Sequence, residues 1–143
     1  MTVIPRDILT GHKIVLIEDE PDSAEVAARV LRFYGADVHM ASNGEEGLAL
    51  IRTVHPVLII CDISMPVMDG WEVIKTIKND PSIMAIPAIA LTAHAMIGDR
   101  EKAFAAGFHN YLTKPLTVAS FIRDLLVLVT DLPQFASIAE AIK

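Results

Sequence analysis

The sequence predicts an α/β protein in which a doubly wound sheet of five parallel strands is covered by helices on both faces. Short apolar, β-branched stretches alternate strictly with segments of helical periodicity, which implies right-handed crossovers between parallel strands. Polar clusters follow the apolar stretches where each one ends, and they are Glu18-Asp19-Glu20, Asp62, Thr92-Ala93 and Lys114-Pro115. The carboxyl ends of parallel strands lie along one edge of a sheet, so we expect these clusters to converge there.

The first half of the chain contains three predicted strands, at residues 13–17, 36–40 and 56–61. Pro21 begins a helix as a first-turn proline, with Glu20 or a neighbour as its cap, and Gly35 ends it. Polar and apolar residues alternate in the second strand, which indicates one wetter face and a place at the edge of the sheet. Asn43-Gly44 begins a second helix, and the uniformly apolar third strand is typical of the buried parallel kind.

The second half of the chain repeats this alternation after a loop, residues 62–70, that is rich in turn formers. The expected helices and strands are 71–79, 85–91, 94–106 and 109–112, in the order helix, strand, helix, strand. Thr117 is the predicted N-cap of a last helix. The apolar stripe of this helix consists of Val118, Phe121, Ile122, Leu125, Leu126 and Val129.

The composition excludes several classes of function. A formal net charge of −6 argues against a nucleic-acid-binding surface, which needs an excess of Lys and Arg. The single cysteine, Cys61, excludes an internal disulfide and suits the reducing cytoplasm, and the five histidines show no spacing typical of a zinc site. The longest unbroken apolar run, residues 57–61, is far shorter than the roughly 20 residues of a membrane span, so we expect no membrane association.

The chain is long enough for one domain with a proper core and too short for two comfortable ones. We expect this domain to cover residues 12–130, after a leader at 1–11 and before a tail at 131–143. The tail has Phe135, Ile138 and Ile142 at helical spacing. It could be an extra helix docked on the domain or a contact surface, and the sequence leaves both open.

The acids at the expected sheet edge predict a cation site. Glu18, Asp19 and Asp62 would repel one another there, and without a counterion at least one would tend to take up a proton. A hard divalent cation removes this conflict, and Mg²⁺ suits a site with few carboxylates, a backbone carbonyl and several waters. We therefore expect Mg²⁺ as the cofactor.

The same cluster suits phosphoryl transfer, in which the protein aligns a nucleophile and neutralises the charge on the transferring oxygens. Asp62 is the candidate nucleophile because a carboxylate can form an acyl phosphate. Lys114 offers a mobile positive charge for a phosphoryl oxygen. Thr92 adds a hydroxyl donor, and Ala93 leaves room for the incoming group.

These residues together resemble the receiver domain of two-component response regulators. They are Glu18-Asp19-Glu20, the loop 62–70, Thr92-Ala93, Tyr111 and Lys114-Pro115, in the order and at the spacing of that family. The resemblance covers about residues 12–130 and implies a flavodoxin-like (βα)5 fold. Because little chain remains outside this range, we expect a stand-alone, single-domain regulator.

The resemblance implies that Asp62 accepts phosphate from a histidine of a sensor histidine kinase or a histidine phosphotransfer protein. Asp19 and Asp62 would bind Mg²⁺ through their side chains and Ser64 through its backbone carbonyl. Glu18 stands where the family usually has an aspartate, and it would act through a water. The chain would catalyse only its own phosphorylation and dephosphorylation and would not be an enzyme in the usual sense.

Thr92 and Tyr111 resemble the family's switch pair, and their movements would alter contacts with a downstream protein. Lys114-Pro115 resembles the family's cis-proline junction. Ser64 and His94 occupy the positions that tune phosphoryl lifetime in the family, although His94 could equally be an exposed residue at a helix start.

Other functions fit the sequence less well. A nucleotide-binding enzyme would need a Gly-rich turn after the first strand, where this chain has acids. A phosphohydrolase would usually carry a second acid two residues after the nucleophile, where Ser64 stands. The alternative that stays open is a degenerate receiver that acts as a phosphorylation-independent interaction module. A second apolar line on the first helix, Val26, Val30 and Phe33, could face a partner or the interior.

Overall fold

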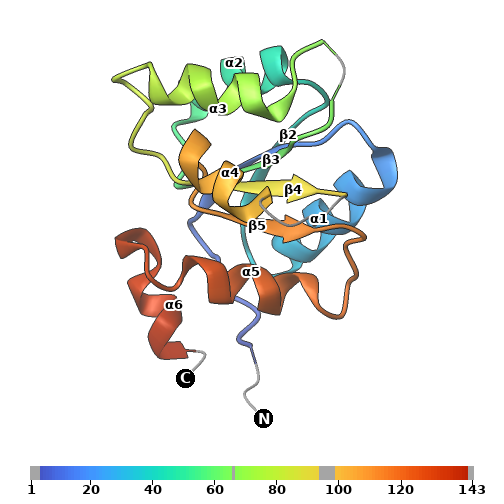
Figure 1. The fold of residues 1–143 in the computed structure, drawn as a ribbon. Helices are drawn as coiled ribbons and strands as arrows, with labels where there is room; N and C mark the ends of the chain where they lie inside the picture. Colours follow the sequence, from blue (N-terminus) through green and yellow to red (C-terminus); the bar gives the residue numbers. More distant parts are fainter. Residues whose placement is uncertain (1–3, 66, 94–98, 142–143) are drawn as a thin grey trace.

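The computed structural model describes residues 4–65, 67–93 and 99–141. Five parallel strands form one sheet in the order β2-β1-β3-β4-β5, so the predicted doubly wound α/β fold is confirmed (Figure 1). The strands are β1 (Lys13–Ile17), β2 (Asp37–Ala41), β3 (Leu58–Asp62), β4 (Ala88–Thr92) and β5 (Asn110–Thr113). The second strand of the chain lies at the edge of the sheet, as the alternation of polar and apolar residues predicts.

Helices cover both faces of the sheet. They are α1 (Pro21–Phe33), α2 (Gly44–Val54), α3 (Gly70–Lys78), α4 (Asp99–Ala106), α5 (Phe121–Val129) and α6 (Ala136–Ala141), the last preceded by a 3-10 turn, η1 (Pro133–Phe135). One core cluster joins the sheet to α1 and α5 through side chains such as Leu31 and Phe121. The other joins the opposite face to α2, α3 and α4, as Ile51, Val73 and Ala103 show.

Proline and glycine set several of these boundaries. Gly35 follows α1 with a φ of +97°, a left-handed conformation that favours glycine and ends the helix as predicted. The strand expected over 85–91 begins only at Ala88, because Pro87 has no N–H for the ladder. The carbonyl of Pro87 instead accepts a hydrogen bond of 2.9 Å from the Ile59 amide.

The predicted beginning of the last helix is wrong by about one turn. Thr117 forms a local turn, in which its Oγ1 accepts a bond of 3.3 Å from the Ser120 amide. The helix therefore begins at Phe121, with Ser120 as its N-cap. Val118 is consequently 61 % exposed and does not belong to the buried stripe of α5. The other five members of that stripe are buried.

The first helix also differs from expectation at its ends. Glu20 occupies the N-cap position, but its side chain makes no capping hydrogen bond to the helix backbone. Of the second apolar line, Val30 is buried, whereas Phe33 is 52 % exposed beneath the guanidinium of Arg6. The line is thus divided between the core and the surface.

The leader and the tail pack on the amino end of the sheet. Leu9 is 1 % exposed, and its amide donates a bond of 2.9 Å to the Tyr34 carbonyl. Phe135 and Ile138 are buried in the same core cluster, and the Phe135 ring stacks on His12 at 5.1 Å between centroids. The described part of the tail is therefore a docked helix, while Ile142 lies outside the described residues.

A search of the described helices for a membrane-spanning segment finds none of sufficient length and apolar character.

Candidate functional site

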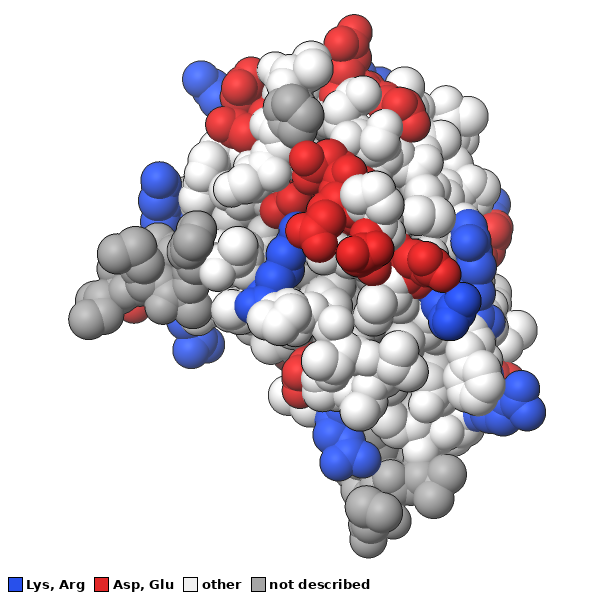
Figure 2. Space-filling view, turned by 90° about the vertical axis from the view of Figure 1, so that its right-hand side faces the viewer, with Lys and Arg blue, Asp and Glu red and all other residues white. Residues whose placement is uncertain are grey.

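The carboxyl ends of the strands gather the predicted polar residues on one face of the molecule. Strands β1 and β3 are neighbours, and Ile17 pairs with Cys61, so the next residues, Glu18 and Asp62, lie level with each other. Figure 2 looks onto this face and shows a cluster of Asp and Glu side chains with a basic side chain beside it. The predicted convergence of separate segments is thus found in the structure.

Lys114 follows β5, which is an edge strand of the sheet, and its side chain contacts both buried acids. Its Nζ donates to Glu18 Oε1 at 2.7 Å and to Asp62 Oδ2 at 3.1 Å. The Lys114 amide donates to the Thr92 carbonyl at 2.8 Å, and the peptide bond to Pro115 is cis, as expected. The lysine side chain is only 11 % exposed, so its charge is directed into the cluster rather than into solvent.

Glu18 lies in an environment that disfavours its charged form. Its side chain is buried, and Oε1 also accepts a bond of 3.1 Å from the Glu20 amide. The buried Oε2 has no hydrogen-bond partner among the described residues. Burial, and then the charge of Asp62, raise the pKa of Glu18 to about 7, although Lys114 opposes both effects.

Asp62 shares this environment at the end of β3. Burial raises the pKa of its carboxyl, and the nearby Asp19 side chain adds to the effect, whereas Lys114 and the Ser64 amide oppose it. The Ser64 amide donates to Asp62 Oδ1 at 3.2 Å. Burial lowers the pKa of Lys114, but the bonds to Glu18 and Asp62 outweigh burial and raise it overall.

The three acids have the arrangement that a hard cation needs. One carboxylate oxygen from each of Glu18, Asp19 and Asp62 lies within 4.8 Å of the others. Mg²⁺ binds through one or two carboxylates and keeps several waters. A cation would give the unpartnered Oε2 of Glu18 a positive partner, and it would lower the raised pKa values of Glu18 and Asp62. These residues therefore fit Mg²⁺.

The loop after Asp62 is held close to the site by Gly70. The Gly70 amide donates to the Ile63 carbonyl at 2.8 Å, and a Cβ at position 70 would lie 2.6 Å from the Asp62 carbonyl oxygen. Asp69 caps α3 by accepting a hydrogen bond of 3.0 Å from the Glu72 amide. The start of α3 therefore fixes the backbone that carries Asp62.

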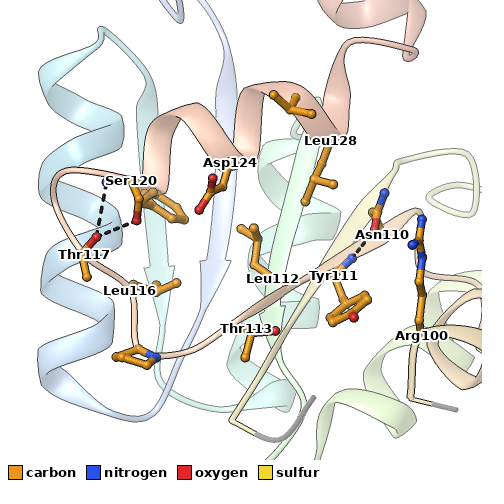
Figure 3. Close-up of a pocket in the computed structure, with 13 residues that line it drawn as sticks. Arg100, Asn110, Tyr111, Leu112, Thr113, Leu116, Thr117, Ser120, Asp124 and Leu128 are labelled. Carbon is orange, nitrogen blue, oxygen red and sulfur yellow. Dashed lines mark hydrogen bonds between the residues drawn. The ribbon is translucent and has the colours of Figure 1, made fainter. Parts of the chain in front are cut away.

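Tyr111 lies between two hollows next to the site. The inner hollow, of about 180 Å³, is lined by Ile63, Ser64, Trp71, Thr92, Lys102, Ala103 and Tyr111. The outer groove, of about 480 Å³, runs along α4, β5 and α5, with Tyr111 and Arg100 at one end and Thr117 and Ser120 at the other (Figure 3). The half-buried Tyr111 therefore contributes to the lining of both hollows.

The structure describes only one of the two positions predicted to tune phosphoryl lifetime. Ser64 is exposed in the loop and lines the inner hollow, whereas His94 lies outside the described residues. The direct bond between Lys114 and Glu18 was not expected from the sequence, although the register of β1 and β3 would have indicated that Glu18 lies beside Asp62. The sequence also gave no indication that Lys102 contacts the Trp71 ring, because this contact joins separate helices.

Comparison with known proteins gives a consistent result. Residues 14–125 match the family model described as "Response regulator receiver domain". An uncharacterized 14.6 kDa protein of Leptolyngbya boryana is 40% identical over 115 residues, which are 80% of this chain and 88% of that protein. The polar-differentiation response regulator DivK of Brucella ovis is 35% identical over 112 residues, which are 78% of this chain and 91% of that protein.

Solved structures resemble the fold over most of its length. A putative response regulator from Chloroflexus aurantiacus superposes with a TM-score of 0.75 at 30% identity and covers 83% of this chain and 98% of its own. The chemotaxis response regulator CheY4 of Vibrio cholerae gives a TM-score of 0.77 at 25% identity, covering 83% of this chain and 99% of its own.

Proposed function

Because this chain belongs to the response regulator receiver domain family, we propose that Asp62 accepts a phosphoryl group from a phosphohistidine donor in a Mg²⁺-dependent reaction. The donor is a sensor histidine kinase or a histidine phosphotransfer protein. The observation that carries the proposal is the bond of Lys114 Nζ to both Asp62 and Glu18 in a buried acidic cluster. This geometry concentrates one nucleophile and its charge partners at a single point.

The transfer needs no further reactant. An Asp62 carboxylate oxygen attacks the phosphorus, the P–O bond forms, and the P–N bond breaks with its electron pair passing to the donor imidazole. Lys114 Nζ is already within hydrogen-bond distance of Asp62 and can follow the developing charge onto a phosphoryl oxygen. Asp19, Asp62 and the Ser64 carbonyl would hold Mg²⁺, with Glu18 acting through a water, and the ion would supply positive charge for the transferring oxygens.

The proposed output is a change in protein contacts. Thr92 moves its hydroxyl toward the phosphoryl group, and the Tyr111 ring turns inward. The position of Tyr111 between the inner hollow and the outer groove supports this role, because a turn of the ring would fill one space and open the other. The outer groove along α4, β5 and α5 is then the surface that a downstream protein reads, while Ser64 and His94 tune the phosphoryl lifetime. We place this signalling in the cytoplasm.

A phosphorylation assay tests the proposal. The wild-type chain, incubated with Mg²⁺ and a small-molecule phosphodonor, should gain the mass of one phosphoryl group, and EDTA should prevent the gain. Asp62→Asn should gain nothing. Asp69→Asn is a matched control in the same loop, because asparagine can still cap α3, and it should be modified like the wild type. An unmodified wild type would overturn the assignment and favour the phosphorylation-independent module, whereas a modified Asp62→Asn would show that another residue accepts the phosphoryl group.

A further inference from the structure

The inner hollow is bounded by a contact between two residues that the proposed chemistry does not use. Lys102 of α4 places its Nζ 4.6 Å from the centre of the Trp71 ring of α3. The Trp71 ring lies edge-on to Phe108, with 6.1 Å between centroids and 72° between planes, and Phe108 is 2% exposed. The indole is therefore anchored on the core side, and the ammonium contacts it as a cation over an aromatic ring.

The same hollow contains both proposed switch residues. Thr92 and Tyr111 line it together with Trp71 and Lys102, in a volume of about 180 Å³. Because Tyr111 also lines the outer groove, an inward turn of its ring moves it toward Trp71 and Lys102. The arrangement of these two residues consequently affects whether the ring can enter.

Lys102 forms a part of the described wall of the hollow that can move. Ala103 is 2% exposed, and Ile63 and Trp71 are half-buried, so the packing around them holds them in place. Among the described residues that line the hollow, only Ser64 and Lys102 are exposed, and serine is too short to close a gap. Lys102 has a flexible four-carbon stem and can leave the indole without disturbing the core.

We propose that Lys102 is a positioning residue that acts through Trp71 and stabilises the resting arrangement of Tyr111. The ammonium lies over the indole while Asp62 is unmodified, and it leaves when the phosphoryl group forms and Tyr111 turns inward. The inference rests on the proposed function. A contact made only in the resting arrangement opposes the phosphorylated one, so its loss favours modification.

Fluoroberyllate, a non-covalent mimic of an aspartyl phosphoryl group, tests the inference. Bound fluoroberyllate is titrated by ¹⁹F NMR in the presence of Mg²⁺, and thermal melts of the free proteins check the fold. Lys102→Met keeps the stem but removes the charge, and its midpoint should fall about two- to five-fold, as expected for an exposed cation–π contact. Lys102→Arg keeps a cation over the ring and should retain the wild-type midpoint.

Two further variants separate this role from a general effect of charge. Lys75 is an exposed lysine of α3 outside the hollow, so Lys75→Met should leave the midpoint unchanged. In a Trp71→Leu background the aromatic partner is gone, and Lys102→Met should have no added effect. If Trp71→Leu does not fold, the comparison of Lys102→Met with Lys102→Arg still decides the matter.

Three results would overturn the inference alone: a wild-type midpoint for Lys102→Met, the same shift for Lys102→Arg, or an undiminished shift in the Trp71→Leu background. Fluoroberyllate that binds the variants more weakly than the wild type would also overturn it. A wild-type chain that shows no bound ¹⁹F signal would instead overturn the proposed function, and the inference with it.

Discussion

The two ends of the sheet bury different kinds of side chain. At the carboxyl end, Glu18 and Asp62 are buried together and share the ammonium of Lys114. At the amino end, the leader and the tail cover the sheet with apolar side chains, of which Leu9 and Phe135 are at most 1% exposed.

This difference separates reactivity from stability. Buried like charges cost free energy unless a cation or a proton relieves them, and this cost favours the binding of a cation at the carboxyl end. Apolar burial at the amino end stabilises the fold without contacting the acids. Removal of an apolar side chain at the amino end should therefore destabilise the fold, whereas added positive charge at the carboxyl end should stabilise it.

The largest expected effect is at the amino end. Phe135 is fully buried, so Phe135→Ala should lower the free energy of unfolding by about 3–5 kcal/mol through lost burial and the cavity left behind. Urea denaturation measures this change. Gln134→Ala, at an exposed neighbouring position, should change it by less than about 0.5 kcal/mol. A small effect of Phe135→Ala would show that the tail contributes little to the stability of this end.

Adding Mg²⁺ should strengthen the carboxyl end by the next largest amount. A metal concentration 100-fold above the dissociation constant should raise the free energy of unfolding by about 2.7 kcal/mol, because only the folded chain brings the three acids together. Urea denaturation with and without Mg²⁺ measures the change. Asp19→Asn should reduce it, whereas Glu45→Gln, an exposed acid of α2, should not. An equal response from both variants would contradict the site.

Acidity should have a smaller effect, and it isolates Glu18. Its pKa is about 7 in the folded chain against an ordinary value of 4.5, so the folded state binds the proton more tightly. Without Mg²⁺, the free energy of unfolding should therefore fall as the pH rises between these two values, because the unfolded chain releases the proton first. Glu18→Gln should flatten this part of the profile of urea midpoints against pH. A profile that rises over this window would mean that the acid is stabilised rather than strained.

The smallest effect is expected for a polar contact at the amino end. Asp131 Oδ1 lies 2.9 Å from His109 Nε2, but the Asp131 side chain is 70% exposed. Asp131→Asn should lower the free energy of unfolding by less than about 1 kcal/mol, since exposed ion pairs contribute little. Urea denaturation at low and high salt checks this value. A larger loss would show that the tail depends on charge as well as on apolar contact.

The sequence predicts most of the fold because its information is local. Each strand is a short apolar run, and each run ends in the polar residues that the parallel sheet brings together, as Asp62 and Lys114 illustrate. The position of the acids needs only the topology and no side-chain detail. For this reason the residues at the carboxyl end could be predicted from the sequence, whereas the packing at the amino end could not.

The remainder depends on competition between local and distant contacts. Val118 fits the helical period of α5, but the turn made by Thr117 and Ser120 takes it out of the helix. Prediction of the docked tail would have required knowing which surface Phe135 packs against. The contact of Lys102 with Trp71 joins two helices whose sequences give no sign of each other.

The stacking of His12 on Phe135 brings the leader and the tail together at the end of the sheet away from the acids. A short flexible linker could join these segments, and the chain could be opened at the exposed Pro81-Ser82 turn, to give a circular permutant with every strand intact. The order in which the ribosome makes the strands would then change, while their neighbours in the sheet would not. The cluster of Glu18, Asp62 and Lys114 should keep its geometry in that rearrangement.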